Sequence, residues 1–211
     1  MDKNWLAKKK IAMDRLKRDI KLGRVDPDIV WILNLINSLE DFYTTSSCSG
    51  RIQITANRLP GDKFSLITLA KWHHVIKKDD FLRVVENSIE ENLWFSVQPP
   101  ILHIACKTLD TAIGMLRLAR NNGFKHAGIQ GITDTRIVVE ITSTERIEVP
   151  IRLKGKYIIS LKNLDELITV ANNLLLRSKG RLVEFGLSLR NVYHKDESES
   201  KEQIIQGQDA T

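Results

Sequence analysis

The sequence predicts an α+β protein in which helices pack on a mixed, largely antiparallel sheet. Apolar residues recur at helical spacing before residue 40, and β-forming residues alternate with polar ones after it. The links between predicted strands are short enough for hairpins, which join antiparallel strands. The chain contains neither GxGxxG nor GxxxxGK[ST], the glycine patterns of nucleotide-binding parallel sheets, so a doubly wound, Rossmann-type fold is not expected.

Two helices are expected first. Residues 3–22 read as an amphipathic helix whose apolar positions are Leu6, Met13, Leu16 and Ile20. Asp26-Pro27 then begins the second helix, with the aspartate as cap and the proline as first helical residue. The buried stripe of this second helix is Ile29, Ile32, Leu33, Ile36 and Leu39.

Strands and further helices follow after Glu40. Strands are expected near residues 42–46, 51–57, 64–72, 94–98, 101–107, 127–132, 136–142 and 146–153. The later helices begin at residues able to cap them, which are Asp79 or Asp80, Thr108, and Ser160 or Asn163. Residues 42–91 and 127–179 share a strand-strand-strand-helix order, which suggests two β-β-β-α units.

Composition bounds the class of protein. With 211 residues, 42% of them hydrophobic, the chain can bury the core of one domain with an appendage. No apolar stretch approaches the roughly 20 residues that span a bilayer, and the first residues do not resemble a secretory signal. The two cysteines lack CxxC spacing, so neither a disulfide framework nor a metal site is expected. We expect a cytoplasmic protein without a membrane partner; the sequence leaves the oligomeric state open.

Three regions are expected along the chain. Residues 1–40 form an N-terminal helical region with a basic first helix, and residues 41–194 form the α+β catalytic domain. Residues 195–211 form an acidic tail without apolar periodicity, which is typical of disorder.

The positive charge is concentrated at one end. Within residues 1–24, nine lysines and arginines stand against three aspartates, so this segment carries the whole net charge of +6. Such a block attracts the phosphate backbone of a nucleic acid, with Lys8, Lys9 and Lys10 as candidate contacts. A solvated helix face is the alternative. An anionic membrane is disfavoured because the apolar face lacks a broad aromatic-rich stripe.

The run from Ser46 to Arg51 reads as a strand-to-strand turn that can hold an anion. Serine hydroxyls are small rotating donors, and Gly50 can take backbone angles that aim amide groups at a ligand. The guanidinium of Arg51 matches a carboxylate or phosphate in a bidentate way. An ordinary serine-rich hairpin turn is the alternative.

Five short sequence motifs, in the order in which they occur along the chain, resemble the tRNA wybutosine-synthesizing protein 3 family. They are the Ser46–Arg51 run, Trp72-His73 with Lys78-Asp79-Asp80, residues 100–106, residues 123–129, and Ser143-Thr144 with residues 147–150. The resemblance implies transfer of a methyl group from S-adenosylmethionine to a ring nitrogen, N4. The implied substrate is the wyosine-type tricyclic guanosine beside the anticodon of tRNA(Phe).

The resemblance places the cofactor at the serine-rich run. Arg51 would bind the anionic end, either the methionine carboxylate or a tRNA phosphate. The surrounding cofactor contacts would be Ser46, Ser47, Cys48 and Gly50. His103 lies between Leu102 and Ile104, and it is either a core histidine or a cofactor contact.

His73 is the expected general base, because an imidazole titrates near neutrality, and the family resemblance favours it over His74. The alternative for His73 is a half-buried histidine bonded to backbone. Trp72 could stack on a flat base, or simply belong to the core. Arg136 could contact phosphate, or be an ordinary surface arginine.

Two other function classes remain open from the residues. A Cys/His hydrolase could use Cys48 with His73 or His103, although a nucleophilic cysteine needs its base within hydrogen-bond reach. A noncatalytic RNA-binding module would need only the basic first helix. It would bind tRNA with steep salt dependence and show no affinity for S-adenosylmethionine.

Overall fold

The structure is a computed structural model, and it describes residues 3–62 and 64–193. The acidic tail predicted over residues 195–211 lies outside the described residues. None of the helices within the described ranges is long and apolar enough to cross a membrane.

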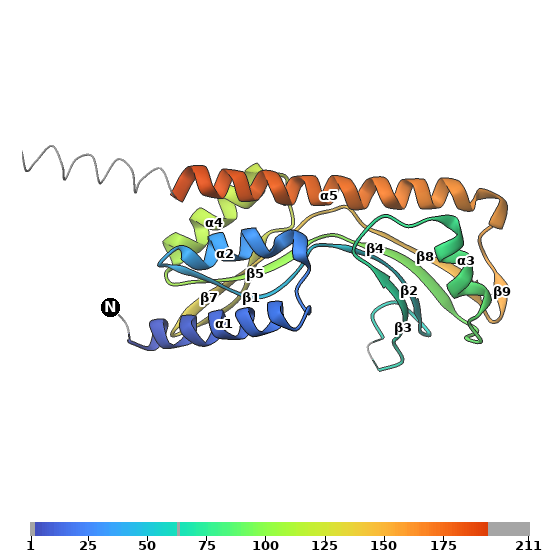
Figure 1. Cartoon of the computed structure of the whole chain (residues 1–211), viewed down its shortest axis with the longest axis horizontal. Helices are drawn as coiled ribbons and strands as arrows, with labels where there is room; N and C mark the ends of the chain where they lie inside the picture. Colours follow the sequence, from blue (N-terminus) through green and yellow to red (C-terminus); the bar gives the residue numbers. More distant parts are fainter. Residues whose placement is uncertain (1–2, 63, 194–211) are drawn as a thin grey trace, which may run out of the picture. The chain divides into compact units, whose positions relative to one another are not determined.

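The α+β prediction is confirmed, with two antiparallel sheets where one was expected (Figure 1). The helices are α1 (Lys3–Lys21), α2 (Val30–Ser38), α3 (Lys78–Glu86), α4 (Leu109–Asn121) and α5 (Leu164–Tyr193), with 3-10 turns at Pro27–Ile29 and Leu161–Asn163. The strands are β1 (Phe42–Cys48), β2 (Arg51–Ala56), β3 (Ile67–Trp72), β4 (Leu93–Gln98), β5 (Ile101–Cys106), β6 (Gly128–Thr133), β7 (Arg136–Thr142), β8 (Ile147–Leu153) and β9 (Lys156–Tyr157).

The two sheets divide strands that are neighbours in sequence. One sheet has the order β1-β5-β7-β6 and the other has the order β3-β2-β4-β8-β9. Strands β1 and β2 therefore do not form the hairpin that the sequence predicted at Ser46–Arg51. Instead, Ser49-Gly50 leads from one sheet into the other, as do Pro99-Pro100 and residues 143–146. The β-β-β-α order recurs with β9 added, but its strands are shared out differently between the sheets.

By its contacts the chain divides into two compact units. The first unit comprises Met1–Ser47, Leu102–Thr142 and Arg181–Thr211, and the second comprises Cys48–Ile101 and Ser143–Gly180. Among the described residues, the first unit contains a large buried core and a smaller cluster of Trp5, Tyr43 and Ala105, and the second unit contains one buried core. The predicted division into residues 1–40, 41–194 and 195–211 stays a prediction.

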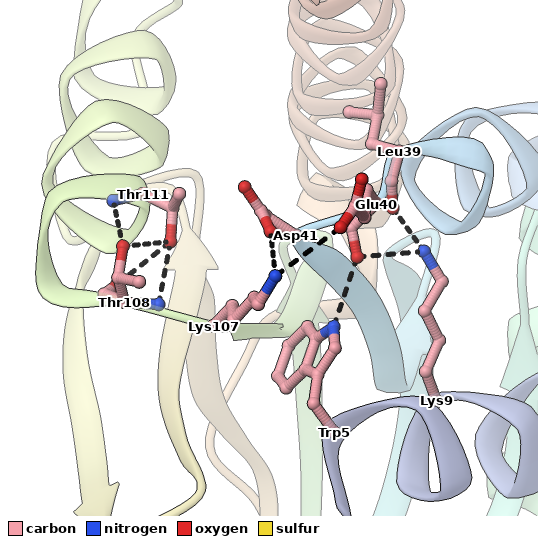
Figure 2. Close-up of polar contacts among 8 residues, drawn as sticks. All are labelled: Trp5, Lys9, Leu39, Glu40, Asp41, Lys107, Thr108 and Thr111. Atoms are coloured by element: carbon pink, nitrogen blue, oxygen red, sulfur yellow. Dashed lines mark hydrogen bonds and ion pairs between the residues drawn. The ribbon is translucent and has the colours of Figure 1, made fainter. Parts of the chain in front are cut away.

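Trp5 fixes α1 in the first unit, where the periodicity had pointed to Leu6. Trp5 is 1% exposed and Leu6 is 41% exposed. The indole ring packs 4.9 Å from the ring of Tyr43. Its N–H donates to the Glu40 carbonyl at 3.1 Å, a hydrogen bond drawn in Figure 2. A tryptophan gains more from burial than a leucine when its N–H finds an acceptor, and this explains the choice.

Asp26 and Pro27 begin the 3-10 turn Pro27–Ile29 rather than α2, which starts at Val30. Of the three later helix starts, two follow the sequence. Thr108 caps α4 by accepting the Thr111 amide at 3.2 Å, and Ser160 accepts the Lys162 amide at the turn before α5. The start of α3 differs, because its cap position is Lys77 and not an aspartate. Asp80 lies three residues later and accepts the Lys77 amide at 2.9 Å, so the carboxylate acts from the first turn.

Candidate functional site

A pocket in the first unit brings together residues that the sequence had assigned separately. It has a volume of about 610 Å³ and is lined by α1, by β1 and by the β6–β7 turn. Ser46 and Ser47 line it from β1, Lys8 from α1, and Arg136 from the start of β7. We call this cavity the α1 pocket. Its volume lies within the range of about 300–1,000 Å³ that is usual for small-molecule sites.

The α1 pocket is suited to an anion. Four cationic side chains line it, with Asp19 as the carboxylate among the lining residues. Asp19 pairs with Arg15 at 3.5 Å and with Arg24 at 3.8 Å. Lys8 Nζ donates to Thr135 Oγ1 at 2.6 Å. Arg136 donates to the Tyr43 hydroxyl at 3.2 Å. Neutral hydroxyl partners orient these two cations without cancelling their charge, so both can still attract an anion.

The three consecutive lysines of α1 have different surroundings. Lys9 donates from Nζ to the carbonyls of Leu39 and Glu40, at the end of α2 (Figure 2). Burial lowers the pKa of Lys9, and the charges of Glu40 and Asp41 partly oppose this shift. Lys10 is exposed. Lys8 thus lines the α1 pocket while Lys9 serves the fold, because successive residues of a helix point about 100° apart. A substrate role for all three stays a prediction.

Four polar side chains form a row across the first sheet, each from a different strand. Ser46 Oγ lies 2.6 Å from His103 Nδ1, and His103 Nε2 lies 2.7 Å from Glu140 Oε2. Gln130 donates to the same carboxylate oxygen at 3.1 Å. Because a carboxylate only accepts, Nε2 carries the hydrogen in this pair. In the neutral ring, His103 then accepts the Ser46 hydroxyl at Nδ1.

The remaining predicted site residues lie in the second unit, around Gly50. His73 Nδ1 donates to the Gly50 carbonyl at 3.0 Å, since a carbonyl can only accept. In the neutral ring this leaves the lone pair on Nε2. Arg51 donates from Nε to Gln53 Oε1 at 2.8 Å and from Nη1 to Cys48 Sγ at 3.7 Å. The structure thus brings Cys48, Gly50, Arg51 and His73 together.

Gly50 is required by its backbone and by its surroundings. Its φ is +89°, in the left-handed region, and a Cβ there would lie 3.1 Å from Pro100 Cδ and 3.2 Å from the Gln98 carbonyl oxygen.

The adjacent histidines His73 and His74 follow the end of β3 in a bend, and they do not occupy opposite faces of a strand. His74 is exposed and His73 is half-buried.

Trp72 and Cys48 have local partners in the same unit. Trp72 pairs with Ile52 in the β2–β3 register, and its half-buried side chain packs against the core of the second unit. Cys48 Sγ lies 3.9 Å from His73 Nδ1. Because that nitrogen donates to Gly50, it is not oriented as a base for the thiol, and this argues against a cysteine hydrolase.

Sequence reasoning missed Glu140 as part of the His103 row. The signal was present in the strand pattern, because Ile137, Val139 and Ile141 are all buried and Glu140 is not. What the pattern could not reveal was the neighbouring strand, since β5 and β7 are separated by α4 and β6 in sequence.

Comparison with known proteins identifies the family. The family model described as Methyltransferase TYW3 matches residues 7–191. A protein of Thermococcus sibiricus, 41% identical over 181 residues, covers 86% of this chain and 92% of its own length. It is named tRNA(Phe) 7-((3-amino-3-carboxypropyl)-4-demethylwyosine(37)-N(4))-methyltransferase. A protein of Methanocaldococcus jannaschii has the same name and is 36% identical, over 86% of this chain and 94% of its own.

Solved structures agree with these sequence relatives. A protein of Pyrococcus horikoshii superimposes with a TM-score of 0.84 at 35% identity, over 88% of this chain and 96% of that one. A protein of Aeropyrum pernix does so with a TM-score of 0.71 at 34% identity, over 79% of this chain and 98% of that one. The match spans both units, and it sets aside the noncatalytic and hydrolase alternatives. The chain is therefore a methyltransferase, which uses a methyl donor, and it belongs to the Methyltransferase TYW3 family.

Proposed function

We propose that this protein transfers a methyl group from S-adenosylmethionine to N4 of the wyosine-type base of tRNA(Phe). The observation that carries the proposal is the shared name of relatives that match more than four fifths of the chain. S-adenosylmethionine would supply an electrophilic methyl group on a sulfonium. The protein has to hold donor and acceptor in line and accept the proton that N4 loses. Alignment alone lowers such a barrier by about 7–11 kcal/mol at best.

The α1 pocket is the proposed site for the acceptor. The base in the relatives' name carries a 3-amino-3-carboxypropyl arm, which adds a carboxylate to the tRNA phosphates nearby. Lys8 and Arg136 line the pocket and are held by neutral hydroxyl groups, so either could bind such an anion. Lys10 adds positive charge on the exposed face of α1.

The residues around Gly50 are the proposed site for the donor. Arg51 would bind the methionine carboxylate of S-adenosylmethionine, with Cys48 and Gly50 beside it. Trp72, predicted as a substrate contact, would stack on the tricyclic base of the tRNA or on the adenine of the donor. Two of the candidate site residues are histidines: His73, which the sequence predicts as general base, and His103. The predicted cofactor contacts of Ser46, Ser47 and His103 stay predictions.

Calorimetry with S-adenosylmethionine and a methylation assay test the proposal together. The acceptor is tRNA(Phe) from cells that lack the corresponding enzyme, and mass spectrometry of its nucleosides should show one methyl group gained on the tricyclic base. The same tRNA made without the tricyclic base is the control. Binding of S-adenosylmethionine without methylation of either tRNA would overturn the assigned substrate, and the absence of binding would overturn the assigned donor.

The role of the basic helix is better tested by point variants than by deletion. Removing residues 1–24 would also remove Trp5, which is 1% exposed and packs on Tyr43. Lys8→Glu changes the charge inside the α1 pocket while Trp5 stays in place. A weaker affinity for tRNA in that variant, with unchanged affinity for S-adenosylmethionine, would support the assigned division of sites.

A further inference from the structure

We propose that Ser46, His103 and Glu140 form the proton acceptor for a group bound in the α1 pocket. This inference rests on the proposed function, in which N4 of the tricyclic base exchanges its hydrogen for a methyl group. Ser46 lines the α1 pocket. Its hydroxyl is hydrogen-bonded to His103, and His103 is hydrogen-bonded to Glu140. All three belong to the first unit.

The geometry gives the row a direction. Glu140 accepts Nε2–H of His103 at 2.7 Å, so Nδ1 is the basic nitrogen, and it lies 2.6 Å from Ser46 Oγ. The carboxylate can stabilise the imidazolium that forms when His103 takes a proton, as the acid does in a Ser-His-Asp triad. A second bond, from Gln130 to the same carboxylate oxygen at 3.1 Å, fixes the orientation of Glu140.

The residue that would contact the ligand is more exposed than the two residues behind it, as a proton relay requires. Ser46 is exposed at the pocket, whereas the side chains of His103 and Glu140 are 20% and 29% exposed. Strand β5 holds His103 firmly, because Leu102 and Ile104 on either side are fully buried. Thr45 also donates to the His103 carbonyl at 3.3 Å, which fixes β1 beside β5. The imidazole is therefore positioned before any ligand binds.

The proton transfer balances without a further reactant. The N4–H proton passes to Ser46 Oγ as the Ser46 hydroxyl proton passes to His103 Nδ1. The electron pair left on N4 forms the bond to the methyl carbon, and the carbon–sulfur bond of the donor breaks with its electron pair staying on sulfur. The products are the N4-methylated base, S-adenosylhomocysteine and imidazolium His103, which then releases its proton to water. Ser46 is the residue that contacts the base, and Glu140 is a positioning residue.

Single-turnover methyl transfer at saturating donor and tRNA tests the relay. Ser46→Ala and His103→Ala should each slow the transfer by about 10²–10⁴-fold, the usual contribution of a general base. KM for tRNA and the affinity for S-adenosylmethionine should change by no more than about threefold. The double variant should be no slower than the slower single variant, because both changes interrupt one path. Added imidazole should restore part of the rate of His103→Ala.

Controls separate the relay from structural effects. Glu140→Gln keeps an acceptor for His103 Nε2–H but removes the charge, so it should lower kcat without raising KM. His126→Ala removes an exposed imidazole of the same unit and should leave the rate unchanged. Ser46 is exposed, so Ser46→Ala should melt like the wild type and remain informative even if His103→Ala does not fold.

Two results would be decisive against the inference. Transfer that persists in Ser46→Ala and His103→Ala but is lost in His73→Gln would overturn the relay alone and assign the proton to His73. A rise in KM or a loss of donor affinity, with kcat unchanged, would show that Ser46 and His103 are binding residues. No transfer by the wild type would instead overturn the proposed function.

Discussion

Replacing Gly50 by alanine tests the connection between the two sheets. At a φ of +89°, a residue with a side chain costs about 1–3 kcal/mol. The added Cβ would also lie 3.1 Å from Pro100 Cδ, 3.1 Å from Pro100 N and 3.2 Å from the Gln98 carbonyl oxygen. Two of these three atoms belong to the backbone, so a change of side-chain rotamer cannot relieve the contact. Forcing such a contact costs about another 1–3 kcal/mol.

Gly61 provides a matched control in the same unit. Its φ is +88°, but nothing lies within 4 Å of an added Cβ. Gly61→Ala should therefore show the backbone cost alone, of about 1–3 kcal/mol, whereas Gly50→Ala should show about 2–6 kcal/mol. The difference between the two variants measures the contact with Pro100 and Gln98.

Denaturant unfolding followed by tryptophan fluorescence gives both values. Methyl transfer should also fall more in Gly50→Ala, because His73 donates to the Gly50 carbonyl and Arg51 is the next residue. Affinity for S-adenosylmethionine should fall along with it. Equal losses of unfolding free energy in the two variants would refute the argument from crowding and leave the backbone angle as the whole effect.

Three further predictions concern the first unit. Lys9→Met should lower the free energy of unfolding by about 1–3 kcal/mol in denaturant titrations, since a charged hydrogen bond at the end of α2 is lost. Lys8→Met should instead weaken tRNA binding and reduce its salt slope by about 1, and it should do so more than Lys10→Met, because Lys8 lines the α1 pocket and Lys10 does not; an identical response from all three lysines would contradict the structure. Burial raises the pKa of Cys106 to about 12 from 9.0, so the thiol stabilises the fold fully below about pH 9 and progressively less above it. From pH 8 to 10 the wild type should lose about 1 kcal/mol more unfolding free energy than Cys106→Ala, and parallel pH curves would show that Cys106 is not buried as described.

Local chemistry predicted the features that depend on neighbouring residues. The cap at Thr108, the special conformation of Gly50 and the burial on both sides of His103 all follow from a few adjacent side chains. The family resemblance rested on short sequence motifs, which are equally local, and the family-model match over residues 7–191 confirms it. The cap of α3 was placed wrongly because Asp79 and Asp80 are as good at N2 and N3 as at the cap itself.

Periodicity, caps and short motifs are local, so the helices, every strand except β9 and the family could be predicted from the sequence. The fold revealed what these patterns did not: β1 and β2 belong to different sheets, and β1, β5, β7 and β6 lie side by side. Strand pairing joins residues far apart in sequence, and no short pattern specifies the partner. For that reason Ser46, His103 and Glu140, which span 94 positions, became one hydrogen-bonded row only in three dimensions.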